Sequence, residues 1–360
     1  MSRLAATIDR IGPLDAAASA AAAEHLDRLT KPPGSLGRLE QLAIQLAGIT
    51  GEQAPTFDRR AIVVAAADHG VAAQGVSAYP SEVTAQMVAN FVAGGAAINV
   101  LARMARADVL VIDVGVASAV SVEASSPPQA GGHLLRRRIR PGTADLSIGP
   151  AMTRQEAIDA IGIGIDVARQ LAGEGVRLVG LGEMGIGNTT AASAIVAALT
   201  GRPPSEVTGR GTGVDDETWR HKVAVIERGL EVNRPDPGDA VGVLAAVGGL
   251  EIAMLTGLAL GVAAERIPVI VDGFITGAAV LVAARLSPAL PRRLIAAHRS
   301  VEPGHAVVLD ELGLRPLLDL DLRLGEGTGA ALAMTLVDAA VRIRDGMATF
   351  ESAGVADESS

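Results

Sequence analysis

The sequence predicts an α/β fold in which a parallel sheet is covered by helices on both faces. Short runs of apolar, β-branched residues alternate along the 360-residue chain with Ala-rich segments of helical character. The runs show no polar alternation, so both faces of each strand should be buried, which is typical of a parallel sheet. Apolar residues make up 49 % of the chain and aromatic residues only 2 %, so the core must consist mainly of Ala, Val, Leu and Ile.

Four apolar runs are the expected strands, and each ends in an acidic residue with a glycine nearby. They are RRAIVVAAADHG from residue 59, ADVLVIDVGV from 107, GVRLVGLGEMG from 175 and RIPVIVDGF from 266. Ligands on parallel sheets bind outside the carboxyl ends of the strands. We therefore expect a functional site at the edge marked by Asp68, Asp113, Glu183 and Asp272.

The covering helices are expected in Ala-rich stretches at residues 83–104, 154–171 and 189–199. Residues 1–50 are also predicted to be helical, with a break at TKPPGSLG. The apolar stretch 240–264 is interrupted by Glu251 and several glycines, which favours buried helices over a membrane span. Residues 118–150 are expected to leave the sheet as a long excursion.

Composition excludes several classes of protein. The net charge of -9 argues against a nucleic-acid-binding surface, and the short basic cluster RRRIR at 136–140 is interpreted as a solvated loop. The absence of cysteine excludes disulfides, thiolate metal sites and cysteine nucleophiles. No signal peptide is visible at the amino terminus. We expect a soluble, cytoplasmic protein that binds neither nucleic acid nor a membrane.

The segment GLGEMGIGNTT at 180–190 contains the pattern G-x-G-x-x-G through Gly180, Gly182 and Gly185. This pattern is typical of dinucleotide-binding loops, but a single match is weak. Glu183 would repel a pyrophosphate, whereas the free amides of the helix that follows suit a single phosphate. A tight strand-to-helix turn without a ligand also fits the pattern.

A second glycine-rich segment, GRGTGVDDETWRHK at 209–222, leads into a helix that carries Lys222. Alternating glycine amides and this lysine make a plausible second phosphate contact. The acids Asp215, Asp216 and Glu217 also favour the first turn of that helix through its dipole, with or without a ligand.

Two metal-binding interpretations are weaker. The run VIVDGFITG at 269–277 is similar to the strand-and-acid pattern of enzymes that use phosphoribosyl pyrophosphate, but Asp272 stands alone where two acids normally hold ribose and Mg²⁺. The spacing of His298, Glu302 and His305 is conceivable for zinc or iron. Pro303 breaks the helix that would align them, so a structural or substrate-shaping role is favoured and no metal is expected.

Glu326 stands between Gly325 and Gly327 in RLGEGTGAALAM, residues 323–334, just before a helix. Glycines this dense let the backbone approach a ligand closely. A carboxylate in this place is either a base held against a substrate or a solvated loop charge.

Taken together, these stretches resemble one family, nicotinate-nucleotide:dimethylbenzimidazole phosphoribosyltransferase. The matching segments occur in the family's order between residues 29 and 334. They are LTKPPGSLGRLE, AADHGVAAQGVSAYPSEVTAQMV, GLGEMGIGNTT, GRGTGVDD, VDGFITGAA, SVEPGH and LDLDLRLGEGTGAALAM. As a set they are far more specific than any single glycine motif.

The resemblance implies a large α/β domain with a Rossmann-like sheet (59–300) and a small helical domain from both chain ends (1–58 and 301–348). The composition of the last residues, ESAGVADESS, predicts a disordered tail (349–360). It implies transfer of phosphoribose from nicotinate mononucleotide to 5,6-dimethylbenzimidazole. The products are α-ribazole 5′-phosphate and nicotinate, and the reaction serves lower-ligand assembly of cobalamin. It further implies a homodimer that needs no metal or other cofactor.

The resemblance also implies roles for individual residues. Glu326 would be the general base that takes a proton from the attacking benzimidazole. Glu183 would lie near the substrates and stabilise the positively charged transition state. The phosphate would lie against the amides around Gly185 and Gly211, with Lys222 as counter-charge. The expected substrate-binding residues are Ser77, Tyr79, Pro80 and Gln86 around the acceptor, and Met184, Gly185, Gly187, Asn188, Thr189, Gly211, Lys222 and Gly325.

Two other hypotheses stay open. An NAD-dependent oxidoreductase would rest on the G-x-G-x-x-G pattern and needs an acid at a strand end about 20 residues later. Glu206 is near that spacing, but GRPPSEVTG at 201–209 is typical of a turn. The other hypothesis is a non-catalytic nucleotide- or azole-binding protein on the same fold, and the presence of Glu326 argues against it.

Overall fold

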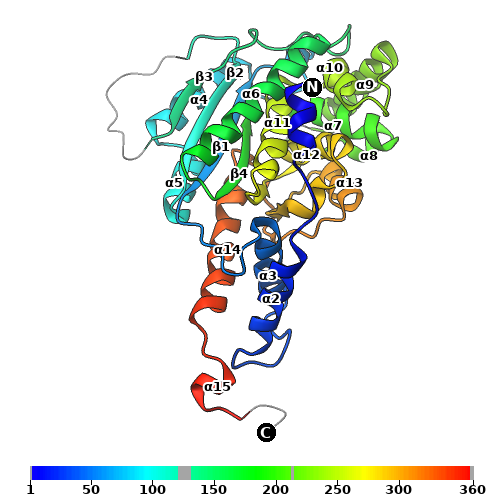
Figure 1. Ribbon diagram of the computed structural model, residues 1–360. Helices are drawn as coiled ribbons and strands as arrows, with labels where there is room; N and C mark the ends of the chain where they lie inside the picture. The colour runs from blue at the N-terminus through cyan, green and yellow to red at the C-terminus, as the bar shows by residue number, and fades with distance from the viewer. Residues whose placement is uncertain (1, 121–130, 212–214, 357–360) are drawn as a thin grey trace.

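A six-stranded, fully parallel sheet organises the molecule, in the strand order β3-β2-β1-β4-β5-β6 (Figure 1). The structure is a computed structural model that describes residues 2–120, 131–211 and 215–356. The predicted α/β class and parallel sheet are confirmed. The strands are β1 (Arg60–Ala67), β2 (Asp108–Gly115), β3 (His133–Arg136), β4 (Leu178–Met184), β5 (Val269–Val271) and β6 (Leu294–Ala296).

The strand order places a switch point between β1 and β4. From β1 the chain adds β2 and β3 on one side, and it then returns to add β4, β5 and β6 on the other. Loops that leave β1 and β4 therefore run in opposite directions and open a crevice at the carboxyl edge of the sheet. This is where the sequence predicts the functional site.

Both faces of the sheet are covered by helices, and β1 shows why its sequence does not alternate. All eight of its residues are buried. Ala61, Val63 and Ala65 face a core shared with α6 (Arg154–Gly173) and α11 (Leu250–Ala264). Ile62, Val64 and Ala66 face a second core, which is shared with α3 (Arg38–Thr50), α4 (Glu82–Ala93), α5 (Ala97–Ala105) and α14 (Thr328–Gly346).

Small residues let α6 and α11 pack at very short range. A Cβ atom added to Gly164 would collide with the backbone of Met254, and one added to Gly257 would collide with the backbone of Ile161. This close contact explains how a core with few aromatic residues is filled. The remaining helices on the sheet-bearing part are α1 (Arg3–Ile8), η1 (Gly70–Gln74), α7 (Asn188–Thr200), α8 (Pro204–Val207), α9 (Asp216–Asn233), α10 (Ala240–Val247), α12 (Phe274–Leu286), η2 (Leu290–Arg293) and α13 (Pro303–Leu312).

A helical lobe extends away from the sheet (Figure 1). It consists of α2 (Ala16–Asp27), α3 and the distal part of α14, with α15 (Phe350–Ala353) at its far end. Backbone hydrogen bonds from Thr30 to Ala348 and from Phe350 to Arg28 join the two chain ends. The predicted domain division stays a prediction. Two helices of the predicted small domain, α1 and α13, lie against the sheet-bearing part, because α1 packs on α6 and α11 and α13 packs on α12.

Three local predictions were wrong. The helix expected at 83–104 is two helices, because Gly94 adopts a left-handed φ of 83° and ends α4. The excursion at 118–150 returns to the sheet as its edge strand β3, whose His133 pairs with Leu110 of β2. Part of the tail expected to be disordered forms α15. Residues 121–130 and 357–360 lie outside the described residues.

One stretch of the described residues, Glu82–Ala105, is long and apolar enough to cross a membrane by length and composition. It comprises α4 and α5, and these helices pack on β2 and, through α5, on α14. The stretch is therefore weak support for a membrane span.

Candidate active site

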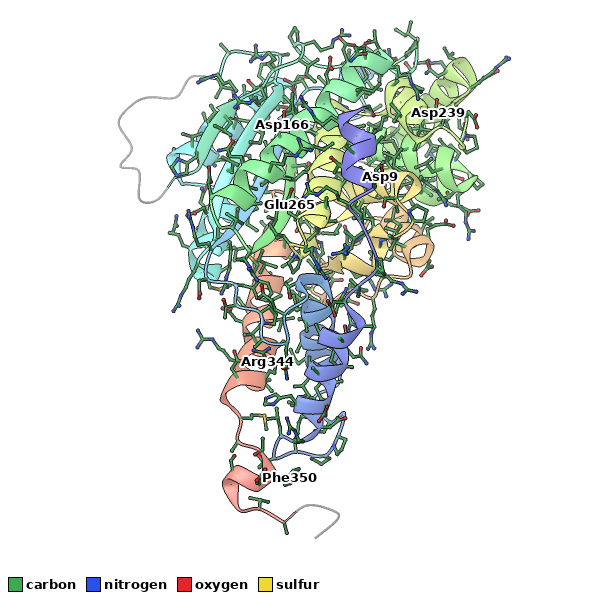
Figure 2. The ribbon with its side chains drawn as sticks, viewed as in Figure 1. Asp9, Asp166, Asp239, Glu265, Arg344 and Phe350 are labelled. Carbon is green, nitrogen blue, oxygen red and sulfur yellow. The ribbon has the colours of Figure 1, made fainter. Side chains whose placement is uncertain are left out.

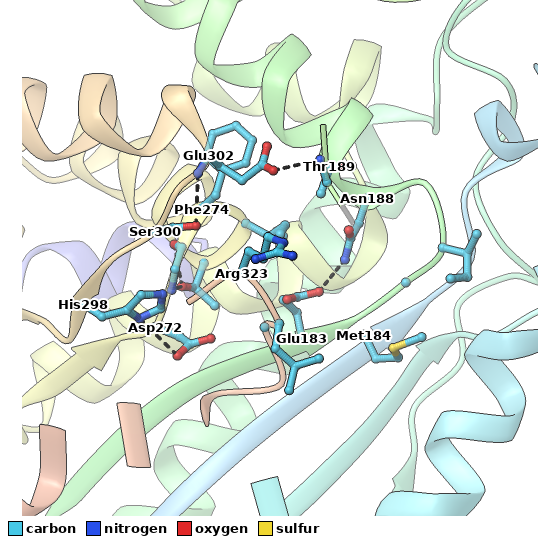
Figure 3. Close-up of a pocket in the computed structure, with 18 residues that line it drawn as sticks. Glu183, Met184, Asn188, Thr189, Asp272, Phe274, His298, Ser300, Glu302 and Arg323 are labelled. Carbon is cyan, nitrogen blue, oxygen red and sulfur yellow. Dashed lines mark hydrogen bonds and ion pairs between the residues drawn. The ribbon is translucent and has the colours of Figure 1, made fainter. Parts of the chain in front are cut away.

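A cavity lies at the carboxyl edge of the sheet, beyond the ends of β4 and β5 (Figure 3). Its floor is formed by Glu183 at the end of β4 and Asp272 after β5. One wall is the start of α7. The other walls are the segment around β7 (His298–Arg299) and the loop that follows β8 (Leu318–Asp319). Two of the four acids predicted to mark this edge thus line one cavity.

Glu183 is buried, and its surroundings favour the protonated form of its carboxyl group. Its carboxylate accepts a hydrogen bond from the side-chain amide of Asn188, as Figure 3 shows. Burial, together with the nearby charges of Asp272, Glu251 and Glu326, raises the pKa of Glu183 to about 8, against the opposing hydrogen bond from Asn188. The predicted pair Glu183 and Asn188 is therefore brought together.

Asp272 joins the cavity to the amino end of α14. Its Oδ2 accepts a hydrogen bond from the Gly327 amide at 3.2 Å, and its Oδ1 accepts one from the Ala330 amide at 3.0 Å. Burial raises the pKa of Asp272 to about 7, against the effect of these amides. The sequence indicated a lone acid here, but its role as an anchor for the Glu326 loop depends on residues far along the chain.

The Glu326 loop has an uncommon backbone. Gly325, Glu326 and Gly327 have φ values of 85°, 65° and 88°, all in the left-handed region. Glycine adopts this region at little cost, whereas a glutamate there is strained. The Glu326 carboxylate is buried, its Oε2 accepts a 3.4 Å hydrogen bond from the Ile98 amide at the start of α5, and burial raises its pKa.

The structure explains the G-x-G-x-x-G pattern without a dinucleotide. Gly180 and Gly182 lie inside β4 and not in the loop that follows. A Cβ atom at Gly182 would lie 2.5 Å from the carbonyl oxygen of Glu326 and 2.8 Å from the amide nitrogen of Gly327. Gly182 lets the Glu326 loop pack directly on the strand, and Gly180 makes room for Ala330 and Met334 of α14, so the pattern gives no support to the oxidoreductase hypothesis.

A cluster of backbone amides with a lysine behind it, named the cradle here, lies beside the carboxylates. It contains the amino end of α7, the Gly211 amide and, behind them, Lys222, whose Nζ donates a 2.7 Å hydrogen bond to Oγ1 of Thr189. Lys222 is 1 % exposed and does not itself line the cavity. Burial lowers its pKa to about 8, while the charge of Glu302 acts in the opposite direction.

The predicted acceptor wall is not brought to this cavity. Ser77, Tyr79, Pro80 and Gln86 are absent from its lining, and Tyr79 is 50 % exposed. The link to this segment is Thr84, whose Oγ1 accepts a 3.1 Å hydrogen bond from the Ile186 amide. The acceptor role of the four residues stays a prediction. Of the other predicted substrate-binding residues, Met184, Gly185, Asn188, Thr189, Gly211 and Gly325 line the cavity, and Gly187 lies between two that do.

Sequence reasoning missed several lining residues, among them Phe274, Ser300 and Arg323. His298 and Glu302, considered above as metal ligands, line the cavity as well. The sequence signal for Phe274, Ser300 and Arg323 was their position in the segments VDGFITGAA, SVEPGH and LDLDLRLGEGTGAALAM, and the signal for His298 and Glu302 was their close spacing. His305 lies behind the cavity, with its ring centroid 6.1 Å from that of His298, and burial lowers its pKa to about 3, so it is neutral.

Comparison with known proteins gives full-length matches. A family model described as phosphoribosyltransferase matches residues 11–355. Proteins named nicotinate-nucleotide–dimethylbenzimidazole phosphoribosyltransferase from Chloroflexus aggregans and from a Roseiflexus species are each 58 % identical, over 358 and 355 residues. The first match covers 99 % of both chains, and the second covers 99 % of this chain and 98 % of its relative.

A solved structure shows the same fold. The crystal structure of the Thermus thermophilus protein of that name is 49 % identical, with a TM-score of 0.88 over 96 % of this chain and 100 % of that one. The family resemblance inferred from the motifs is confirmed. The chain, similar to these proteins from end to end, belongs to the nicotinate-nucleotide–dimethylbenzimidazole phosphoribosyltransferase family.

Proposed function

We propose that the protein transfers the phosphoribosyl group of nicotinate mononucleotide to 5,6-dimethylbenzimidazole, giving α-ribazole 5′-phosphate and nicotinate for the lower ligand of cobalamin. The observation that carries this proposal is an anion cradle beside buried carboxylates in one cavity. The names of relatives more than half identical to this chain support the same reaction.

The donor has the charge distribution that such a cavity favours. Nicotinate mononucleotide carries a phosphate at one end of its ribose and a positively charged pyridinium nitrogen on the anomeric carbon. The cradle at Gly211 suits the phosphate. Glu183 and Asp272 suit the positive charge, which moves onto the ribose as the bond to nicotinate breaks.

Glu326 is the proposed general base. When a benzimidazole nitrogen bonds to the anomeric carbon, the N–H on the other ring nitrogen becomes acidic and needs an acceptor. A buried carboxylate with a raised pKa is a better proton acceptor than an exposed one at neutral pH. The left-handed backbone that Gly325 and Gly327 flank supports a fixed, functional position for this side chain.

We further propose that the protein acts in the cytoplasm as a homodimer, with small-molecule substrates and without a cofactor, metal, nucleic-acid or membrane partner. The resemblance of the sequence motifs supports this assembly. Light scattering coupled to size-exclusion chromatography tests it, and a mass of one chain in solution would contradict it.

Glu326→Gln tests the proposed base. Without a proton acceptor, formation of α-ribazole 5′-phosphate should slow by about 100-fold or more, while donor binding persists. Chromatographic product analysis for wild type and variant, without added metal, measures this effect. A fully active variant would remove the base assignment. A wild type that binds both substrates without turnover would support the non-catalytic hypothesis.

A further inference from the structure

Glu302 occupies an unusual position at the junction of two cavities. It immediately precedes α13, and its side chain lines both the active-site cavity and a neighbouring one that contains Trp219. The residue is 6 % exposed, so its carboxylate is almost completely withdrawn from solvent. A buried carboxylate needs compensating partners, because the loss of water around its charge is costly.

The main partner of the Glu302 carboxylate is the Gly211 amide, which is also the proposed contact of the donor's phosphate. Oε1 of Glu302 accepts a hydrogen bond from the Gly211 amide at 2.8 Å, whereas Oε2 has no hydrogen-bond partner. A Cβ atom at Gly209 would lie 2.5 Å from Cδ of Glu302, so the loop at 209–211 fits closely around this carboxylate, and a side chain at 209 would push it away. Figure 3 shows the Glu302 carboxylate beside Thr189 at the top of the cavity.

Positive charge is also close. A Cβ atom at Gly211 would lie 3.9 Å from Nζ of Lys222, which places the ammonium group just behind the amide. The charge of Glu302 favours the protonated form of this buried lysine. Glu302 thus places at the Gly211 amide a negative charge of the kind that a bound phosphate would bring.

We propose that Glu302 is a placeholder for the donor's phosphate. Its carboxylate accepts the hydrogen bond of the Gly211 amide until the phosphate binds, and it then leaves that amide to the phosphate. This inference rests on the phosphate site of the proposed function. A dianionic phosphate can displace the carboxylate because it offers more charge and more acceptor oxygens to the same amide and lysine. A nucleoside without phosphate cannot, so Glu302 selects for phosphorylated donors.

A purely structural role for Glu302 makes the opposite prediction. If the carboxylate only braced the loop at 209–211, its removal would loosen the cradle and weaken phosphate binding. If it is a placeholder, replacing it with the neutral glutamine removes a repulsive charge and leaves only a neutral oxygen on the amide, which phosphate displaces more easily, so phosphate should bind more tightly.

Glu302→Gln decides between the two roles. Titration calorimetry with inorganic phosphate should give a dissociation constant about tenfold lower than that of wild type, which corresponds to about 1.4 kcal/mol. The KM for nicotinate mononucleotide should fall with it. Unchanged or weaker phosphate binding would overturn the proposal. Glu311→Gln is the matched control, because Glu311 is an exposed carboxylate on the same helix and should leave the affinity unchanged.

Lys222→Met separates failure of this inference from failure of the proposed function. If that variant binds phosphate as well as wild type does, the cradle is not the phosphate site and both proposals lose their basis. If Lys222→Met binds phosphate more weakly than wild type while Glu302→Gln does not bind it more tightly, only the placeholder role fails.

A crystal structure of wild type with phosphate tests the role without any variant. The proposal requires the Glu302 carboxylate to have left the Gly211 amide, and a retained contact contradicts it.

Discussion

At the scale of single residues, burial of the cavity carboxylates favours their neutral forms. Burial raises the pKa of Glu183 to about 8 and that of Asp272 to about 7. Two such groups with Glu326 nearby cannot all ionise cheaply in one buried site, so the protonated forms are favoured, most strongly at Glu183. A positively charged pyridinium ring in the cavity would stabilise the ionised forms in place of those protons.

Donor binding should therefore release protons. A bound cation lowers the pKa of Glu183, which is mostly protonated at pH 7 in the free protein, so a proton leaves on binding. By linkage, the affinity for nicotinate mononucleotide should rise as the pH rises toward 8. Calorimetry at pH 7 in two buffers of different ionisation enthalpy measures the number of protons released.

Ribose 5-phosphate is the matched control ligand, since it carries the phosphate but no pyridinium charge. It should release fewer protons than the donor does, and Glu183→Gln should reduce the difference between the two ligands. Equal release with both ligands would show that the carboxylates do not respond to the ring.

At the scale of elements, the active site depends on how closely the Glu326 loop packs on β4. Gly182 has no side chain at the point where the loop crosses the strand, and Asp272 fixes the start of α14 through two backbone amides. The strained backbone at Glu326 persists because both contacts hold it. Each contact can be tested separately.

Gly182→Ala should displace the loop. Its methyl group would meet the backbone of Glu326 at 2.5 Å, and neither backbone can yield easily. We expect destabilisation of about 1–3 kcal/mol in urea unfolding, together with a clear loss of kcat. Gly173→Ala is the control: it lies in α6 with nothing near its Cβ position and should stabilise the protein by about 0.5–1 kcal/mol. A fully active, stable Gly182→Ala protein would show that the loop contact is dispensable.

Asp272→Asn should weaken the anchor of α14. The amide side chain keeps one oxygen but presents an N–H group to a backbone N–H, so one of the two hydrogen bonds to Gly327 and Ala330 is lost. We expect kcat to fall by roughly 100-fold, because small misplacements of a catalytic group are costly. Steady-state kinetics measure the loss, with the exposed Asp319→Asn as control. An unchanged kcat would show that Asp272 does not position the loop.

At the scale of the whole molecule, α14 connects the active site to the helical lobe. The helix begins at the Glu326 loop, crosses the lower edge of the sheet and continues beside α3 (Figure 1). Arg60 at the start of β1 fastens it through paired hydrogen bonds to Asp338, and it also donates to the carbonyls of Phe57 and Ala105. Figure 2 shows the side chains that fill the space between this helix and its neighbours.

Asp338→Asn should loosen the connection between sheet and lobe. Arg60 is 7 % exposed and would lose its counter-charge while it stays buried. We expect a loss of about 1–3 kcal/mol in the free energy of unfolding. Urea unfolding measures this loss. Asp166→Asn removes an exposed carboxylate from a surface ion pair and should change stability little. If the two variants had equal stability, the buried connection would contribute no more than a surface pair.

The sequence by itself determined the α/β class, four of the sheet strands and the edge at which the cavity lies. These features follow from local patterns, since an apolar run without alternation requires burial on both faces and acids at its carboxyl end meet at one edge. Its motifs also determined the family. Only the tertiary structure decided that the segment after residue 118 returns to the sheet as β3. It also decided that Gly180 and Gly182 make room for neighbouring segments. Finally, it showed that Asp272 and Glu302 accept hydrogen bonds from backbone amides of distant segments. The physical reason is that each of these features is a contact between segments far apart in the chain, and a contact of that kind leaves no periodic signal in either segment.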